Sequence, residues 1–463
     1  MINVYIDYSC FYCKALINYL TINNINFTTV NINDAPPYIK SIGLIPIINI
    51  NSNIIEGFDI DKIDSNLNII GCKHDSVYLD NAATTKLSDE VFKEMRPYMR
   101  ENFANPSSIY SIGLKNRDVI NKTRDKIATI LNCDKEEIFF TSGGSEANNM
   151  AIKGISFANK HKGNHIITSM IEHSSVISTC KYLETKGFRV TYLPVNKYGL
   201  ISIAQLEASI TDKTILISIM HANNEIGTIQ DIIQIGNIAK KHNVYFHTDA
   251  VQTAGKIAIN LSKVNANLLS LSAHKFYGPK GIGVLYIKNN TKIDPLIHGG
   301  SQEYSMRAGT ENVSNIVGLG KALELSVKRI DTNQQYIKSL QIQLISQILK
   351  NIPEAKLNGH KSNRLCDNVS ITLNNLSYLD SYMLRFLLDT NRIYISSGSA
   401  CNELNGTSSH VLKAIGLDDS QCNKTLRFTL GFDNTREDID YTVNTLIIII
   451  NKLAKYYNRE KIK

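Results

Sequence analysis

The stretch "SLSAHKFYGPKGIG" (residues 270–283) decides the fold of this chain. It completes an apolar run that begins at Leu268, and the run ends in Ser272, His274 and Lys275 before a turn rich in glycine and proline. In open α/β sheets, the functional side chains lie beyond the carboxyl ends of the buried strands. A lysine in that place, beside a serine and a histidine, can form a Schiff base with an aldehyde. The stretch therefore predicts a mostly parallel sheet with a reactive lysine at one strand end.

Three other apolar runs end in polar residues that complement this lysine. "FFTSGGSEANN" sets Gly144 and Ser145 where a strand gives way to a helix, which is typical of anion sites. "FHTDAVQ" contains Asp249 and Gln252, and an aspartate can pair with a protonated ring nitrogen. His173 of "SMIEHSSV" opens a predicted helix. Each feature alone is equally a turn, a helix cap or a surface residue, but together they are the parts of a pyridoxal 5'-phosphate (PLP) site.

The alternation of strands and helices predicts four segments along the chain. Residues 1–70 form a small βαβ…ββ unit, and residues 71–76 form a polar linker. A large α/β domain is expected over 77–330, opening with a strand at 77–84, and a smaller α+β domain over 331–463.

Composition excludes several classes of protein. The chain has 463 residues, is 43% hydrophobic and 20% charged, and carries a formal charge of +8 without a basic run, so neither direct nucleic-acid binding nor a membrane protein is predicted. Its strongest apolar run, "LIIII" at 446–450, is too short to span a bilayer. Eight cysteines are too sparse for a disulfide scaffold, and the first residues lack the features of a secretory signal. A cytoplasmic protein is therefore predicted.

The stretch "SSGSAC" (396–401) puts Cys401 among glycine and serine, without large apolar neighbours. A structural cysteine usually has such neighbours, whereas glycine and serine favour a solvated loop. The loop alone leaves a structural and a reactive cysteine open. A PLP site in the same chain favours the reactive thiol.

Residues 77–463 resemble a cysteine desulfurase, a fold-type-I PLP enzyme, over their whole length. The matching stretches, in order, are "YLDNAATT", "NPSSIYSIG", "EIFFTSGGSEANNMAIKG", "EHSSV", "HANNEIGTIQD", "HTDAVQTAGK", "LSAHKFYGPKGIGVLY", "MRAGTEN", "SSGSAC" and "LRFTLG". The resemblance implies an α/β PLP-dependent transferase fold, in which a large domain with a mostly parallel sheet is followed by a smaller α+β domain. It also implies a homodimer that removes sulfur from L-cysteine, releases L-alanine and passes a persulfide from Cys401 to an acceptor such as an iron–sulfur scaffold protein.

The resemblance carries a role to each matching residue. The residues implied to hold the cofactor ring are Lys275, which forms the Schiff base, Asp249 at the pyridinium nitrogen, Gln252 at the ring hydroxyl, and His173, which stacks and moves protons. Those implied to hold the phosphate are Gly144, Ser145, Ser272 and His274, with Thr310 from a partner subunit. Those implied to receive the substrate carboxylate are Asn224 and Arg427, because a guanidinium binds a carboxylate with two parallel bonds.

Other activities fit parts of the same pattern. A selenocysteine lyase would use the same residues, and alanine release from both substrates distinguishes the two. A PLP-dependent aminotransferase gives the loop cysteine no role. A non-enzymatic sulfur-protein scaffold is disfavoured because every catalytic position is filled. The residues after Cys401, "NELNGTSSHVL", keep the family's loop length but not its usual sequence, which concerns the choice of acceptor.

The N-terminal segment carries a second cysteine motif. "SCFYCK" (9–14) places Cys10 and Cys13 between a strand and a helix, which is typical of a redox site. Half of a zinc site is the alternative, but no second C-x-x-C exists and no metal site is predicted. Residues 1–70 resemble a glutaredoxin-like domain of the thioredoxin fold, with Pro46 at the family's cis-proline position. The fusion suggests that Cys10 attacks the Cys401 persulfide and Cys13 resolves the bond; fusion for co-expression alone is the other interpretation.

Overall fold

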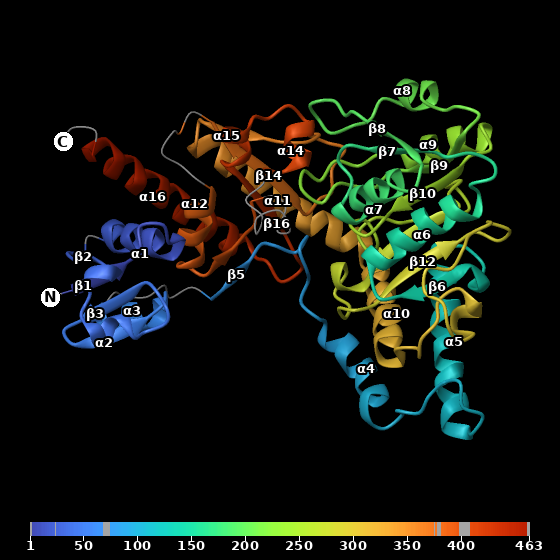
Figure 1. Ribbon diagram of the computed structural model, residues 1–463, viewed down its shortest axis with the longest axis horizontal. Coiled ribbons are helices and arrows are strands. Elements are labelled where there is room, and N and C mark those ends of the chain that lie inside the picture. The colour runs from blue at the N-terminus through green and yellow to red at the C-terminus, as the bar shows by residue number, and fades with distance from the viewer. Residues whose placement is uncertain are drawn as a thin grey trace.

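The computed structural model describes residues 2–23, 25–67, 75–374, 376, 381–397 and 408–460 (Figure 1). Cys401 lies outside these residues, as does most of the segment expected to be the linker. No helix in the described part of the chain is both long and apolar enough to cross a membrane.

The N-terminal unit is a four-stranded sheet with helices packed against it. The strand order is β2-β1-β3-β4; β1 pairs with β2 in parallel and with β3 antiparallel, and β3 and β4 form the expected hairpin. The peptide bond before Pro46 is cis. Side chains of β1 and β3 pack with those of the first helix, including Cys13. The elements in chain order are β1 (Ile2–Ile6), α1 (Phe11–Ile22), β2 (Thr28–Asn31), α2 (Pro37–Lys40), β3 (Ile47–Ile50), β4 (Asn53–Glu56) and α3 (Ile60–Leu67).

The large domain is built on a seven-stranded sheet of order β6-β12-β11-β10-β9-β7-β8, in which β12 alone is antiparallel to its neighbours. The mostly parallel sheet expected from the sequence is therefore confirmed. Its strands are β6 (Ile138–Thr141), β7 (His165–Ser169), β8 (Arg189–Leu193), β9 (Thr214–Ser218), β10 (Tyr245–Asp249), β11 (Leu268–Ser272) and β12 (Gly283–Ile287).

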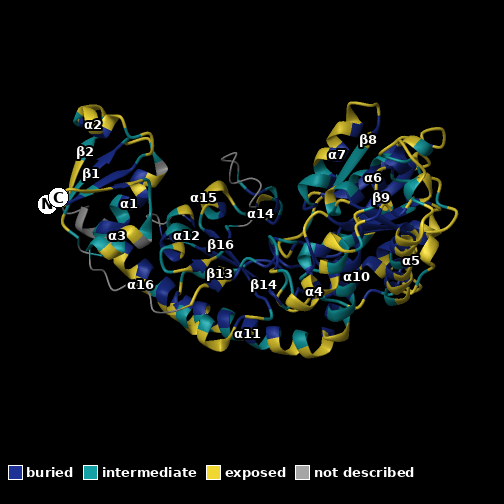
Figure 2. Cartoon of the chain, turned by 90° about the horizontal axis from the view of Figure 1, so that it is seen from below, coloured by how far each residue is buried: buried dark blue, intermediate teal, exposed yellow. Residues whose placement is uncertain are grey.

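Helices cover both faces of this sheet, which is why its strands are apolar along their length. Leu269 and Leu271 of β11 pack with α4, α5 and α10, whereas the intervening Leu268 packs with α6 and α7 on the other face. Figure 2 shows the strands as buried between helices whose outer surfaces are exposed. The helices are α4 (Asp89–Arg100), α5 (Ser111–Leu131), α6 (Gly144–Ala158), α7 (Ser174–Glu184), α8 (Ile203–Ala208), α9 (Ile232–Lys241) and α10 (Val313–Lys328).

The small domain has a three-stranded antiparallel sheet of order β13-β14-β16, packed against long helices. The run "LIIII" lies within its last helix and is not a strand. The elements are α11 (Ile330–Asn351), β13 (Ala355–Leu357), β14 (Asn368–Leu373), α12 (Ser381–Asp389), β15 (Ile393–Tyr394), α14 (His410–Ala414), α15 (Asp419–Cys422), β16 (Thr425–Thr429) and α16 (Arg436–Glu460).

One boundary differs from the sequence expectation. The strand expected at 77–84 is only β5 (Val77–Tyr78), and it pairs in parallel with β15 of the small domain rather than joining the large sheet. Asp80 then bridges to Thr429 of β16. Val77 and Leu79 are buried in the small-domain core. Burial against that core therefore decides which sheet this strand joins, although the segment directly precedes the large domain in the sequence.

The N-terminal unit docks on the small domain. Its helix α1 contacts α12 and α16, the rings of Phe58 and Phe386 have centroids 4.5 Å apart, and the Asn18 amide donates to Met383 Sδ at 3.5 Å. In both Figure 1 and Figure 2 the small domain lies between this unit and the large domain.

Candidate active site

A cavity of about 340 Å³ lies where the carboxyl ends of the large-domain strands face the small domain. This is where open α/β sheets bind ligands. It brings together most of the residues predicted from the sequence, namely Gly144, Ser145, His173, Asn224, Asp249, Gln252, Ser272, His274, Lys275 and Arg427.

Lys275 lies in a short turn that directly follows β11. Its Nζ donates to the carbonyl oxygens of Ala82 and Ala83, at 2.6 and 2.7 Å. The pKa of Lys275 is lowered to about 8, mainly by burial and then by the nearby cations Lys256 and Arg427. A larger fraction of this amine is therefore uncharged at neutral pH than in an ordinary lysine.

Asp249 ends β10 and is held from two sides. Its Oδ2 accepts from the Asn148 amide at 2.7 Å, and its Oδ1 accepts from the backbone N–H of Val251 at 2.9 Å. Asn148 lies on α6 and was not singled out in the sequence. The signal was its place one turn after Ser145, on the helix that begins at the strand end.

His173 is the N-cap of α7, at the helix start expected from the sequence. Its Nδ1 accepts from the Ser175 backbone N–H at 3.1 Å, which leaves Nε2 to carry the proton in the neutral ring. Burial is the main reason that the pKa of His173 is lowered. The neighbouring Glu172 is fully buried, its pKa is raised to about 8 by burial, and it accepts from Ser169 Oγ and the Met220 N–H.

The N-terminus of α6 forms a narrow cradle. Its N-cap, Gly143, has φ 151°, a conformation that favours glycine. A Cβ at Gly144 would lie 2.7 Å from Val251 Cγ2, so a larger residue would intrude on the cavity wall. Ser145 and Ser272 line the same side. Free N–H groups at a helix start, with hydroxyls beside them, suit a phosphate.

Arg427 lines the same cavity from the small domain. Only 2% of the residue is exposed, its Nη2 lies 2.8 Å from Asp80 Oδ1, and its Nη1 donates to the Asn224 carbonyl at 3.2 Å. Asp80 was not predicted, because β5 places it here from about 350 positions away in the sequence.

Both stems of the cysteine loop are anchored beside the cavity. On one side, Ser396 and Arg427 exchange backbone hydrogen bonds of 3.1 and 2.6 Å. On the other, His410 Nε2 lies 2.9 Å from the Glu172 carbonyl oxygen, next to His173. In the sequence, Cys401 lies between these two stems.

Thr310 is the predicted residue that does not reach the cavity within one chain. It is exposed and lines a separate hollow of about 280 Å³ with Ser142 and Arg307.

Cys10 and Cys13 form a second site, on the N-terminal unit. Cys10 is the N-cap of α1, and its Sγ accepts from the Cys13 backbone N–H at 3.4 Å. Cys13 is 1% exposed, and burial, followed by the hydrogen bond with Cys10, raises its pKa to about 12.

The model of the family "Aminotransferase class-V" matches residues 77–442. Cysteine desulfurase IscS of Methanosarcina thermophila is 52% identical over 384 residues, which cover 83% of this chain and 94% of that protein. The chain belongs to the class-V aminotransferase family. Cysteine desulfurase IscS of Dictyoglomus turgidum is 48% identical over 81% of this chain and 95% of its own length. Within the family, the chain is therefore a PLP-dependent cysteine desulfurase.

Solved structures agree with this desulfurase assignment. A NifS-like protein matches with a TM-score of 0.77 and 37% identity, over 81% of this chain and all of its own. "SspA in complex with cysteine" matches with a TM-score of 0.68 and 39% identity, over 77% of this chain and 99% of its own.

The cavity of the desulfurase suits PLP. It presents a buried amine, a buried carboxylate and a glycine-walled helix start, which are complementary to an aldehyde, a ring nitrogen and a phosphate. Gln252 donates to the Ala82 carbonyl, while its Oε1 is buried without a hydrogen-bond partner among the described residues. That acceptor matches the ring hydroxyl of the cofactor.

Proposed function

We propose that this desulfurase removes sulfur from L-cysteine and holds it as a persulfide on Cys401. The observation that carries the proposal is the backbone pairing of Arg427 with Ser396. Arg427, whose buried guanidinium suits the substrate carboxylate, is thereby hydrogen-bonded to Ser396 at the start of the loop that contains Cys401.

The cavity residues divide into three groups by the part of the complex they would hold. PLP, when bound, withdraws electrons from the α-carbon of an amino acid attached to it. Lys275 attaches the cofactor, Asp249 keeps the ring nitrogen protonated, and Gln252 and His173 hold the ring. Gly144, Ser145, Ser272 and His274 receive the phosphate, and Asn224 and Arg427 receive the carboxylate of cysteine.

The protein groups around the substrate are prepared for proton movement. Released from the cofactor, Lys275 accepts the α-proton, because its lowered pKa keeps more of the amine uncharged. The Nε2–H of His173 is available to donate. The Cys401 thiolate attacks the substrate sulfur, the carbon–sulfur bond breaks, and the β-carbon takes a proton to become the methyl group of alanine. Lys275 then returns the proton to the α-carbon. Sulfur remains on Cys401 as a persulfide.

Trapping of the persulfide tests this function. After one turnover with cysteine, alkylation and mass spectrometry should find one extra sulfur on the peptide that contains Cys401. Cys401→Ser should retain the cofactor and bind cysteine but release almost no alanine, whereas Cys133→Ser serves as the matched control. Normal alanine release from Cys401→Ser would refute the assignment.

The desulfurase is also proposed to act as a homodimer that delivers sulfur to an acceptor protein such as an iron–sulfur scaffold. Thr310 is exposed and remote from its own cavity, which suits a contribution to the phosphate site of a second copy. Phe103, Ile109 and Tyr110 are 75, 88 and 54% exposed, an apolar surface that a second copy would cover. Sedimentation should give twice the chain mass, and an active monomer would contradict the proposal.

The N-terminal unit is proposed to be a glutaredoxin-like domain of the thioredoxin fold that clears the persulfide. Support comes from its sheet order and from the burial of Cys13 behind Cys10. Cys10 attacks the outer sulfur of the Cys401 persulfide, which frees the Cys401 thiolate and leaves a persulfide on Cys10. Cys13 then attacks Cys10 Sγ, hydrosulfide leaves, and the two thiols supply the two electrons as they form a disulfide. A low-molecular-weight thiol reduces that disulfide.

Single cysteine variants test this route. Cys13→Ser should accumulate a persulfide on Cys10, because the resolving thiol is missing, whereas Cys10→Ser should leave the extra sulfur on Cys401. The small domain lies between the N-terminal unit and the large domain (Figure 1), so we expect sulfur to leave the cavity before it meets Cys10. If Cys13→Ser carries no sulfur on Cys10, the redox role of this unit is wrong.

A further inference from the structure

A second largely buried lysine, Lys256, lines a small cavity together with Lys275. Lys256 follows β10, and its Nζ is 2.7 Å from Asp367 Oδ2, with side chains 15% and 4% exposed. Gly255, with φ +71°, brings this turn so close that a Cβ there would lie 2.9 Å from Phe276 Cβ, one residue past Lys275. The ion pair joins the large domain to the small domain, just before β14.

A cavity of about 20 Å³ lies among Lys256, Lys275 and Asp367. That volume accommodates about one water molecule, which needs two or more polar partners. Asp367 Oδ1 and the Asn333 amide nitrogen, both at this cavity, are buried without hydrogen-bond partners in the described part of the chain. The cavity is therefore suited to a water that links the ion pair to the back of the active site.

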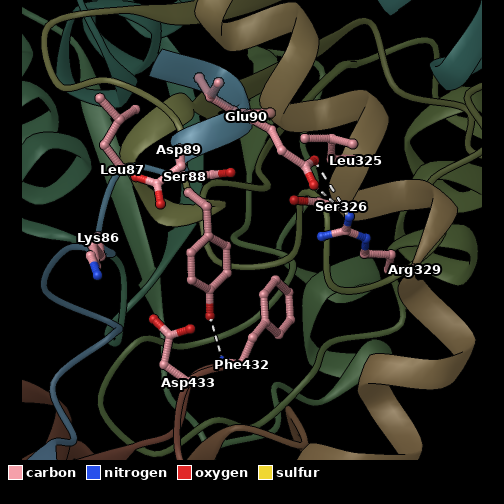
Figure 3. Close-up of a pocket in the computed structure, with 13 residues that line it drawn as sticks. Lys86, Leu87, Ser88, Asp89, Glu90, Leu325, Ser326, Arg329, Phe432 and Asp433 are labelled. Atoms are coloured by element: carbon pink, nitrogen blue, oxygen red, sulfur yellow. Dashed lines mark hydrogen bonds and ion pairs between the residues drawn. The ribbon is translucent and has the colours of Figure 1, made fainter. Parts of the chain in front are cut away.

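Two aromatic residues, Tyr277 and Phe432, line one side of this cavity. Tyr277 and Phe432 stack with centroids 4.2 Å apart, and the Phe432 N–H donates to the Tyr277 hydroxyl at 2.9 Å. Both rings also line an outer crevice of about 290 Å³, drawn in Figure 3, where Arg329 pairs with Glu90. The Lys256 side chain is only 15% exposed, so its field on Lys275 is less screened by water than that of a surface charge, although Asp367 partly offsets it.

We propose that Lys256 is a positioning residue for Lys275: clamped by Asp367 across the domain boundary, its ammonium acts on the Lys275 amine through the small cavity that both lysines line. The inference rests on the role of Lys275 proposed above. Lys256 exchanges no proton in this scheme and touches neither substrate nor cofactor.

The charges around Lys275 give the direction of the effect. The cations Lys256 and Arg427 disfavour a positive charge on Lys275, whereas the carboxylates Asp80 and Asp249 favour it. The nearby His173 and His274 have pKa values lowered by burial, which favours their uncharged forms. After burial, Lys256 is the largest contribution that lowers the pKa of Lys275. Without it, Lys275 should hold its proton to higher pH, and cofactor binding should become less favourable because it requires the neutral amine.

The test measures the pH dependence of Lys275 acetylation in the full chain after removal of PLP, by trace labelling and mass spectrometry. Lys256→Met should raise the midpoint by about one pH unit, whereas Lys256→Arg, which keeps the charge, should have the midpoint of the unsubstituted protein. Lys263→Met, which removes an exposed lysine of the same domain, should leave it unchanged. The double variant Lys256→Met with Asp367→Asn avoids an unpaired buried carboxylate if the single variant does not fold, and its midpoint should rise by less because the Asp367 charge is removed as well.

The outcomes separate this inference from the proposed function. An unchanged midpoint in both charge-removing variants would overturn the role of Lys256. If PLP fails to protect Lys275 from acetylation in the holoenzyme, the proposed attachment of the cofactor is wrong instead. If Lys256→Arg raises the midpoint as much as Lys256→Met does, the effect comes from the shape of the side chain rather than its charge, and the inference is overturned as well.

Discussion

The N-terminus of α1 and the cavity at the sheet both contain a buried titratable group, and burial moves their pKa values in opposite directions. It raises the pKa of Cys13 to about 12 and lowers that of Lys275 to about 8. In both cases burial disfavours the charged form, which is the thiolate for cysteine and the ammonium for lysine. The neutral amine is thereby a better base, whereas the neutral thiol is a weaker nucleophile than its thiolate.

The two sites also differ in how they are built. Cys10 and Cys13 lie three residues apart on one helix start, so their geometry is local. The cavity draws its residues from five strand ends and from the small domain. A substitution in one site should therefore leave the structure of the other intact. The following predictions test this structural independence and the proposed sulfur transfer between the two sites.

The largest effect is expected from Lys275→Ala. Without the amine, the cofactor should lose its lysine-bound absorbance, and alanine release should fall by at least about a thousandfold, because attachment and proton transfer are both lost. The midpoint of a redox titration of Cys10 and Cys13 should not move. Retention of the lysine-bound spectrum together with full turnover would show that another residue holds the cofactor.

A smaller loss is expected from Arg427→Lys. A lysine keeps the charge but loses the paired donors, so KM for cysteine should rise about 10- to 100-fold with a smaller change in kcat. Arg436→Lys, at the exposed start of α16, is the matched control. Equal KM values for the two variants would remove Arg427 from the substrate site.

The alkylation rates of Cys10 and Cys13 should differ by roughly tenfold or more at pH 8, because Cys13 is buried and mostly protonated. Since only the thiolate reacts, Cys13 labelling should increase as the pH rises toward its pKa of about 12. Mass spectrometry of the two alkylated forms after brief iodoacetamide treatment measures the ratio. Faster labelling of Cys13 would reverse the assigned roles of the two cysteines.

The smallest effect is expected from removal of residues 1–72. The first turnover of alanine should be unchanged, while steady turnover under limiting thiol should fall about two- to fivefold, because the tethered thiol is lost. Cys10→Ser should reproduce this defect, and excess small-molecule dithiol should abolish it. Equal rates of the full and shortened chains under limiting thiol would mean that the two sites work separately.

The sequence by itself determined the parallel sheet, the helix that begins at His173 and the set of strand-end residues in the cavity. It also determined the C-x-x-C pair at the start of α1. These features are local: apolar runs, glycines and polar strand ends lie within a few residues of one another, and parallel strands carry their ends to one edge. Cys401 was also found in this way, and its role remains a prediction.

Only the tertiary structure decided which groups hold those residues in place. The Ala82 carbonyl meets Lys275 across 193 positions, and Asp80 meets Arg427 across 347. Asn148 meets Asp249 across 101, and Lys256 meets Asp367 across 111. No periodicity or motif in the sequence predicts such pairs, because they depend on how the two domains pack. They also depend on the pairing of β5 with β15 of the small domain. The identities of the reacting groups are therefore local in the chain, whereas their charge states and orientations are set by packing between distant segments.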